Sequence, residues 1–213
     1  MRRIGLVSWL LLAGAAVVGC TPGPAAGWQP GPITTLPPAS QSLDASPSGP
    51  ATPASPSVPT IPDSDGALDA SGYESAHFAS PSGRIWCALY PEWTLCHFPR
   101  DMDLSEVPST QEVCPEAELD VTGVSVGVED ADYFCSGGAE ALPQTNGDYV
   151  GWWRDSGFPA VKYDGQRFAT LPYGEKLRRG RFVCLSERSG VTCGNTQTGA
   201  GFKISRAGVV IIK

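Results

Sequence analysis

The chain is poor in histidine, the residue on which many hydrolytic and metal sites depend. Its 213 residues include only two histidines, His77 and His97, and a Ser-His-Asp or Cys-His site would need one of them. Its seven cysteines include no C-x-x-C pair, the spacing that zinc sites favour. The sequence therefore predicts a non-catalytic protein with no metal and no cofactor.

Only the N-terminus carries a long apolar run. Arg2 and Arg3 precede the apolar residues 4–18, a stretch too short for a normal membrane-spanning helix and typical of an export leader. The run ends in V-V-G-C, which resembles a bacterial lipobox and implies that Cys20 is diacylated after removal of residues 1–19. Two acyl chains hold a protein stably on a membrane. An ordinary secretory leader with an incidental cysteine is the alternative.

Bulky apolar residues are scarce from the anchor to residue 71. Twelve of the twenty prolines lie between Pro22 and Pro62, among Ala, Ser, Thr and Gly. Such a composition buries too little apolar surface to offset the entropy of ordering. Residues 20–71 are therefore expected to form a disordered linker behind the lipidated cysteine. Residues 72–213 are expected to form one extracytoplasmic domain on the outer face of the cytoplasmic membrane.

Six cysteines remain after Cys20, an even number in a chain predicted to enter an oxidising compartment. Six cysteines allow fifteen pairings. Residues about nine apart face each other across a tight hairpin, which brings them within disulfide reach. This spacing pairs Cys87 with Cys96 and Cys184 with Cys193, and it leaves Cys114 for Cys135. The segments around the first two pairs share a Gly-Arg start, a similarity that duplication or separate origins explain equally well.

Apolar alternation in the domain favours β-structure. Turn signals such as Asp164-Gly165 and Ser189-Gly190 separate the strands, and Ser109 with Glu112 predicts a capping box for a helix over 109–119. The expected class is all-β or β-rich α+β, a small disulfide-stapled domain of short antiparallel strands and hairpins. The expected strands cover residues 85–89, 94–98, 121–128, 133–135, 167–171, 182–185, 191–193, 202–204 and 209–212.

Three segments together resemble a family of exported bacterial domains, abundant in actinobacteria and without an established activity. They are F-A-S-P-S-G-R-I-W-C at 78–87, L-P-Y-G-E-K-L-R-R-G-R-F-V-C at 171–184 and S-G-V-T-C-G-N-T-Q-T-G-A-G-F-K-I-S-R at 189–206. Arg84 departs from the asparagine usual in that family. The resemblance covers residues 76–213 and implies fold and location, with no catalytic residue to carry over.

Two features predict a ligand surface. Trp152 and Trp153 are expected on a strand, where neighbours face opposite ways and one ring is left for stacking on a sugar. Packing of these rings on the core and its disulfides is the alternative, and it is the one that small domains favour. The basic run 175–181 contributes Arg178, Arg179 and Arg181, which suit an anionic polymer or lipid head group.

Charge is unevenly distributed along the domain. Twelve acids lie between residues 100 and 148, and eleven bases follow from residue 149. Either the halves pair across the fold or the surface is bipolar. A net charge of −7 argues against nucleic acid. The predicted function is a membrane-anchored envelope lipoprotein that binds an envelope protein or cell-wall polymer. A carboxylate-dependent cell-wall hydrolase and a purely structural component are the alternatives.

Overall fold

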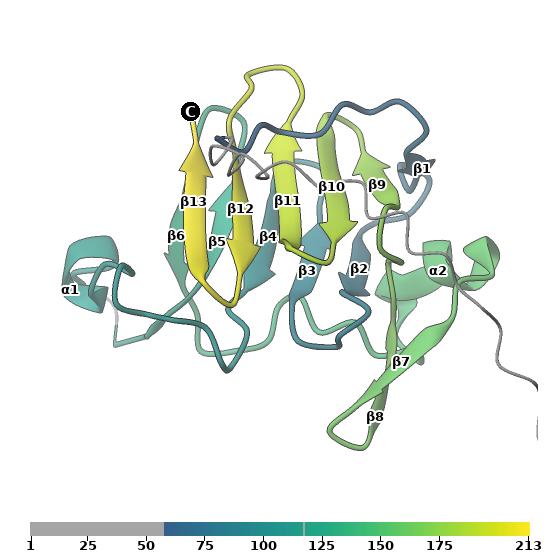
Figure 1. The fold of residues 1–213 in the computed structure, drawn as a ribbon, viewed down its shortest axis with the longest axis horizontal. Coiled ribbons are helices and arrows are strands. Elements are labelled where there is room, and N and C mark those ends of the chain that lie inside the picture. The colour runs from purple at the N-terminus through teal and green to yellow at the C-terminus, as the bar shows by residue number, and fades with distance from the viewer. Residues whose placement is uncertain (1–57, 117) are drawn as a thin grey trace, which may run out of the picture. The chain divides into compact units, whose positions relative to one another are not determined.

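The computed structural model describes residues 58–116 and 118–213. The expected leader, Cys20 and the linker up to residue 57 lie outside this part of the chain. The described residues form two larger β-sheets that pack face to face (Figure 1). The expected fold class, a β-rich domain of short, mainly antiparallel strands with three disulfides, is therefore confirmed.

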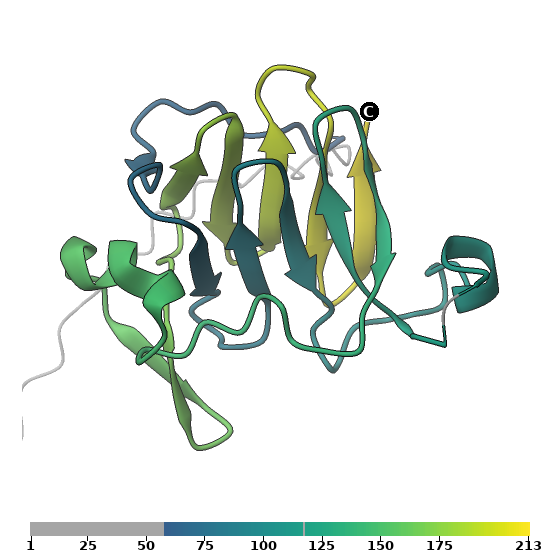
Figure 2. The same cartoon turned by 180° about the vertical axis from the view of Figure 1, so that it is seen from behind.

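Each large sheet contains a five-stranded antiparallel meander in sequence order. Figure 2 shows the first sheet from its outer side; its strands are β2 (Ala76–Ala79), β3 (Trp86–Leu89), β4 (Thr94–His97), β5 (Val121–Val126) and β6 (Ala131–Cys135). The second meander comprises β9 (Lys176–Arg179), β10 (Phe182–Glu187), β11 (Gly190–Asn195), β12 (Gly201–Ser205) and β13 (Gly208–Ile212). The short strand β1 (Leu68–Asp69) joins β9 in parallel at the edge of this second sheet.

The remaining elements lie at opposite ends of the sandwich (Figure 1). Helix α1 (Thr110–Val113) lies beside the β6 edge. At the other end, the 3-10 helix η1 (Asp148–Val150) runs into α2 (Gly151–Ser156), and the hairpin of β7 (Ala160–Tyr163) and β8 (Gln166–Ala169) projects beyond the sheets.

The two meanders share one plan. In each, a disulfide joins directly opposite residues of the second and third strands, Cys87 to Cys96 and Cys184 to Cys193. Equivalent strands also lie on one another, β4 on β11, β5 on β12 and β6 on β13. The shared strand order, register and disulfide position favour an internal duplication over separate origins of the two cysteine hairpins.

The two cross-strand disulfides form the centre of the core. All four cysteines are fully buried, and Cys96 Sγ lies 3.9 Å from Cys193 Sγ across the interface between the sheets. Buried aromatic side chains surround them: Phe78, Phe182 and Phe202. Each disulfide lies within one hairpin, and the two bridges pack against each other. Two hairpins that would be marginally stable alone thus stabilise each other.

All three predicted disulfide pairings are confirmed. The Cα atoms of Cys87 and Cys96, and those of Cys184 and Cys193, lie 4.1 Å apart. The third bridge joins Cys114, just after α1, to Cys135 at the end of β6, with a Cα separation of 6.5 Å. It ties an otherwise peripheral segment to the edge of the first sheet.

The predicted helix begins correctly and ends too late. Ser109 and Glu112 form the expected capping box, but α1 stops at Val113 instead of continuing to residue 119. Cys114 is held by its disulfide, and it precedes Pro115, which disfavours helical geometry in the residue before it. The sequence did not predict β1, β2 and β9 as strands. The hairpin expected at Asp164-Gly165 is confirmed as β7–β8.

The predicted domain boundary at residue 72 is wrong, because residues 61–71 belong to the folded unit. Leu68 and Asp69 pair with Leu177 and Arg178 as strand β1. A Cβ added to Gly194 or Gly201 would meet the Ile61 side chain at 2.3 and 2.6 Å, so these glycines make room for it. The N-terminal strap, residues 58–67, therefore crosses the outer face of the second sheet.

Candidate anion-binding groove

The predicted tryptophan surface is not formed, because Trp152 and Trp153 lie on helix α2 and not on a strand. Trp152 is only 2% exposed, and its Nε1–H donates to the carbonyl of His77 at 3.0 Å. Trp153 is half-buried and packs against the main core. The pair therefore anchors α2 to the sandwich, which is the structural role given above as the alternative.

Two of the three predicted arginines hold the edge of the second sheet together. Arg178 forms an ion pair with Asp69, and Arg179 donates two hydrogen bonds to the carbonyl of Tyr73, at 2.9 and 2.7 Å. Arg181 lies near the side chain of Gln197, at 3.4 Å. The basic run is strand β9 and its turn, and the charges of Arg178 and Arg179 are used to fix residues 68–73 beside it.

A different set of residues converges at one end of the sandwich. Four segments line a polar groove of about 430 Å³: the β2–β3 turn, the loop after β8, the β10–β11 turn and the β12–β13 turn. Its lining consists of Ser80, Ser82, Arg84, Ile85, Tyr173, Glu187, Arg188, Ser189, Gly190, Ser205, Arg206 and Ala207. The S-P-S-G-R, L-P-Y-G and I-S-R segments quoted above all contribute to it. We call it the arginine groove.

Local sequence explains how the first turn presents Arg84. The hydroxyls of Ser80 and Ser82 lie 2.9 Å apart, and Ser80 Oγ accepts a hydrogen bond from the Ile85 N–H. Gly83 adopts φ +74°, which glycine reaches without strain. A Cβ on Gly83 would lie 2.6 Å from Cβ of Tyr163, so this glycine also lets hairpin β7–β8 pack onto the turn.

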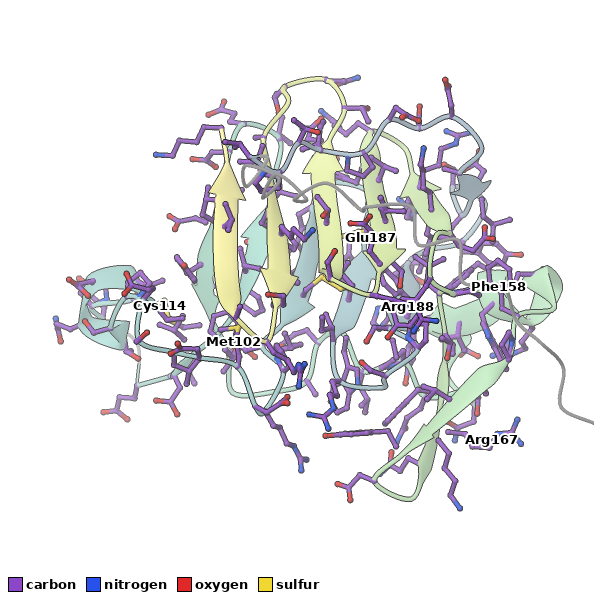
Figure 3. The ribbon with its side chains drawn as sticks, in the orientation of Figure 1. Met102, Cys114, Phe158, Arg167, Glu187 and Arg188 are labelled. Atoms are coloured by element: carbon purple, nitrogen blue, oxygen red, sulfur yellow. A yellow bond between two sulfur atoms is a disulfide. The ribbon has the colours of Figure 1, made fainter. Side chains whose placement is uncertain are left out.

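The groove has more positive than negative side chains. Arg84 forms an ion pair with Asp101, and the same carboxylate lies 3.9 Å from Arg206. Glu187 is matched by Lys203 at 3.5 Å. Arg188 lies over the ring of Tyr173, 5.1 Å from its centroid, and makes no ion pair among residues 58–116 and 118–213. Figure 3 shows Glu187 and Arg188 where β10 passes into its turn.

Four cationic and two anionic side chains thus meet here, beside several hydroxyls. Guanidinium groups and hydroxyls are donors suited to the oxygens of phosphate or carboxylate groups. The arrangement can hold an anion at a largely solvent-facing site.

The two histidines are held in the neutral form by burial. Burial lowers the pKa of His77 to about 4, while its Nδ1 lies 3.4 Å from the Leu142 carbonyl. Burial also lowers the pKa of His97, against the opposing effect of Glu140. His97 Nε2 lies 3.0 Å from Glu140 Oε2 but is not aligned for a hydrogen bond. His97 is buried, and a hydrogen bond with the Thr122 backbone also opposes the lowering of its pKa.

Residues 123–127 read G-V-S-V-G and match the G-x-S-x-G pattern of a nucleophile elbow. They lie in β5 and at its end, where the chain turns directly into β6, so no strand–turn–helix elbow is formed. Ser125 Oγ donates to the Asp132 carbonyl at 3.4 Å.

The groove residues most relevant to ligand binding, Arg84, Arg188 and Arg206, were not among the predicted ligand residues. Arg84 lies in the quoted segment 78–87, and Arg206 ends the quoted segment 189–206. Arg188 lies between the quoted segments 171–184 and 189–206. That signal was present in the sequence, but only the packing of the sheets brings the segments together.

The fold and groove define a class: a disulfide-braced sandwich of two similar five-stranded meanders with a cationic groove at one end. No protein-family model, curated protein or solved structure matches the chain. Among the described residues, no helix has the length and apolar character needed to cross a membrane.

Proposed function

We propose that the protein is a lipid-anchored, non-catalytic binding protein of the cell envelope. In this proposal Cys20 carries the acyl anchor, the proline-rich segment gives reach, and the folded unit presents the arginine groove to an anionic envelope component. The lipobox-like V-V-G-C and the leader support the anchor. The convergence of four separate turns on one cationic groove is the observation that carries the binding role.

The chemistry of the groove favours a polymer that bears phosphate or carboxylate groups. Arg188 and Arg206 are exposed and lie on tight turns, so their guanidinium groups are accessible to a ligand while the turns fix where each side chain leaves the backbone. Neither arginine is neutralised by a carboxylate of its own. Arg188 makes no ion pair among the described residues, and Arg206 shares Asp101 with Arg84. An anion that enters the groove therefore gains charge-assisted hydrogen bonds.

The alternative of a carboxylate-dependent hydrolase needs two acidic groups facing each other across a cleft. The arginine groove is lined by one carboxylate, Glu187, which pairs with Lys203. Glu129, Asp130 and Asp132 line a separate surface hollow, where all three come from a single hairpin turn. No described feature favours hydrolysis over binding.

Co-sedimentation with cell-wall material tests the proposal. The test protein is residues 20–213 with Cys20→Ser, which retains the linker and all three disulfides. It is expected to sediment with an insoluble wall fraction, and to do so less after acid extraction of phosphate-bearing polymers. The double variant Arg188→Ala/Arg206→Ala is expected to lose about tenfold in retention. Arg167→Ala, which removes an exposed arginine outside the groove, is the matched control. Equal retention of all three proteins would contradict the binding role.

A further inference from the structure

A second groove adjoins the first at Arg84. It has a volume of about 370 Å³, and Arg84 lines both grooves. Its walls are mainly aromatic and aliphatic, with Trp86, Phe98, Leu104 and Tyr163 from four different segments. Leu104 is 56% exposed, an unusual degree for a leucine beside a groove. We call this second site the aromatic groove.

Neither polar ring atom at the aromatic groove is open to a ligand. Trp86 Nε1–H donates to the Gly83 carbonyl at 2.8 Å. His97 Nε2 is buried, 3.0 Å from Glu140 Oε2. A sugar ring needs several free donors and acceptors beside a stacking face, whereas a hydrocarbon chain needs only apolar surface. The groove therefore matches a hydrocarbon chain better than a sugar.

We propose that the two grooves together bind one anionic amphiphile, with its phosphate in the arginine groove and its hydrocarbon chain along the aromatic groove. This inference rests on the proposed binding function and specifies its ligand. Arg84, between the two grooves, contacts the phosphate from the side nearest the chain. The surplus of cationic side chains recognises the head, and apolar burial recognises the tail.

Hairpin β7–β8 completes the aromatic groove. Tyr163, at the end of β7, lines the groove and packs against Gly83 of the turn that carries Arg84. Asp164, at the hairpin tip, lies 3.5 Å from Arg100, which lines the same groove. The hairpin thus forms one wall of the aromatic groove and packs on the turn that carries Arg84, the residue common to both grooves.

Calorimetric titration of residues 20–213 with Cys20→Ser tests the inference with three soluble probes. Dihexanoyl phosphatidic acid carries head and tail, glycerol 1-phosphate carries the head alone, and dihexanoyl phosphatidylcholine carries the tail with no net charge. We expect the phosphatidic acid to bind about tenfold or more tighter than either of the others. This comparison separates a lipid phosphate from a free phosphate as the source of the anion.

Variants assign the two halves of the ligand. Arg188→Ala and Arg206→Ala are each expected to weaken phosphatidic acid and glycerol phosphate alike, by about tenfold. Leu104→Ser is expected to weaken only phosphatidic acid, by several-fold, and to leave glycerol phosphate unchanged. These side chains are exposed, so the fold tolerates their removal. Arg167 lies on β8 but lines neither groove (Figure 3), so Arg167→Ala is expected to change nothing.

Three results overturn the inference. If glycerol phosphate binds as tightly as phosphatidic acid and Leu104→Ser has no effect, the aromatic groove does not bind the hydrocarbon chain. If phosphatidylcholine binds as tightly as phosphatidic acid, the arginine groove does not bind the phosphate. If none of the three probes binds, neither groove binds this class of ligand. Wall retention that still depends on Arg188 and Arg206 would leave the proposed function standing while this inference fails.

Discussion

Gly83 meets two requirements that no other residue type satisfies together. Its φ of +74° lies in the left-handed region, and its missing Cβ admits Tyr163. We expect Gly83→Ala to lower the free energy of unfolding by about 2–4 kcal/mol, through backbone strain plus displacement of hairpin β7–β8. Urea unfolding under oxidising conditions measures the change.

Gly165, in the tip of the same hairpin, is the matched control for this substitution. It has a similar φ of +78°, but nothing lies within 4 Å of an added Cβ. Gly165→Ala therefore carries only the backbone cost, about 1 kcal/mol. Equal losses for the two variants would show that the Tyr163 contact contributes nothing.

His77 makes stability depend on pH in a defined window. It stacks on Tyr149 with ring centroids 4.3 Å apart, and burial lowers its pKa from 6.5 to about 4. The unfolded chain takes up a proton on this residue near pH 6.5, while the folded chain takes it up only near pH 4. The contribution of His77 to stability is therefore fully present above pH 6.5 and falls by roughly 3 kcal/mol as the pH is lowered to 4.

The variant His77→Phe isolates this effect, because it keeps an aromatic ring against Tyr149 and removes the titrating group. His97 also has a lowered pKa and adds to the slope in both proteins. We expect the difference in unfolding free energy between wild type and variant to change with pH between 6.5 and 4. Parallel curves across that range, measured by urea titration at fixed ionic strength, would disprove the assignment.

At the scale of elements, the three disulfides differ in accessibility. Cys87, Cys96, Cys184 and Cys193 are fully buried between the sheets, whereas Cys114 and Cys135 are partly exposed. Thiol–disulfide exchange requires access of the attacking thiolate to a sulfur. We expect mild reductant under native conditions to open only the bridge between Cys114 and Cys135, with a stability cost of about 3 kcal/mol in the chain-entropy model.

Alkylation followed by peptide mass mapping reads out this order. Label confined to Cys114 and Cys135 agrees with it, and the variant Cys114→Ala/Cys135→Ala serves as the fully protected reference. Early label on Cys87 or Cys193 in native protein would mean that the core disulfides open without unfolding.

The N-terminal strap is a second element whose contribution can be measured. Ile61 fits over Gly194 and Gly201, and Asp63 forms an ion pair with Lys176 at 2.6 Å. A chain that begins at residue 72 also loses β1 from the edge of β9. We expect it to unfold about 2 kcal/mol more easily than a chain that begins at residue 58, mainly through lost apolar burial.

Thermal and urea unfolding of the two truncated chains measure this difference. The variant Ile61→Ala in the longer chain is expected to reproduce part of the loss, and Asp63→Asn a smaller part because that pair is largely exposed on the acid side. Equal stability of the two truncated chains would show that residues 61–71 contribute nothing to the folded unit and belong to the linker.

At the scale of the whole molecule, charge remains separated along the domain. Of the twelve acids between residues 100 and 148, only Asp101 makes an ion pair among the residues that the structure describes, since Glu140 lies beside the neutral His97. Helix α1 and its acidic neighbours lie at one end, while β7–β8, with Lys162 and Arg167, projects at the other (Figure 1). The bipolar alternative raised by the sequence therefore agrees better with the structure than pairing across the fold.

The anchor is a property of the whole chain and can be tested separately from the groove. Wild-type protein is expected in the membrane fraction after cell disruption and in the detergent phase on phase separation. Cys20→Ser removes the acylated sulfur, and we expect the variant to lose labelling by a fatty-acid analogue. Labelling that persists in this variant would contradict lipidation at Cys20.

Much of the fold was readable from local pattern. Nine predicted strands correspond to observed ones, because alternation and turn residues report on a few neighbouring positions. Strand β9 was missed because its sequence, K-L-R-R, has one apolar residue and its arginines bond to residues about a hundred positions away. Helix α2 was missed because two adjacent tryptophans and a glycine carry little helical signal.

The sequence by itself determined two disulfide pairings, since opposing positions of a hairpin follow from spacing along one short stretch of chain, and the third pair followed by elimination. It also determined the β-rich class. The tertiary structure alone decided that Trp152 is core, that Arg178 and Arg179 are structural, and that Arg84, Arg188 and Arg206 meet. Arg84 lies on a turn of the first sheet, and Arg188 and Arg206 lie on turns of the second. Their distance from Arg84 depends on how the sheets stack, which is set by long-range packing around the two central disulfides.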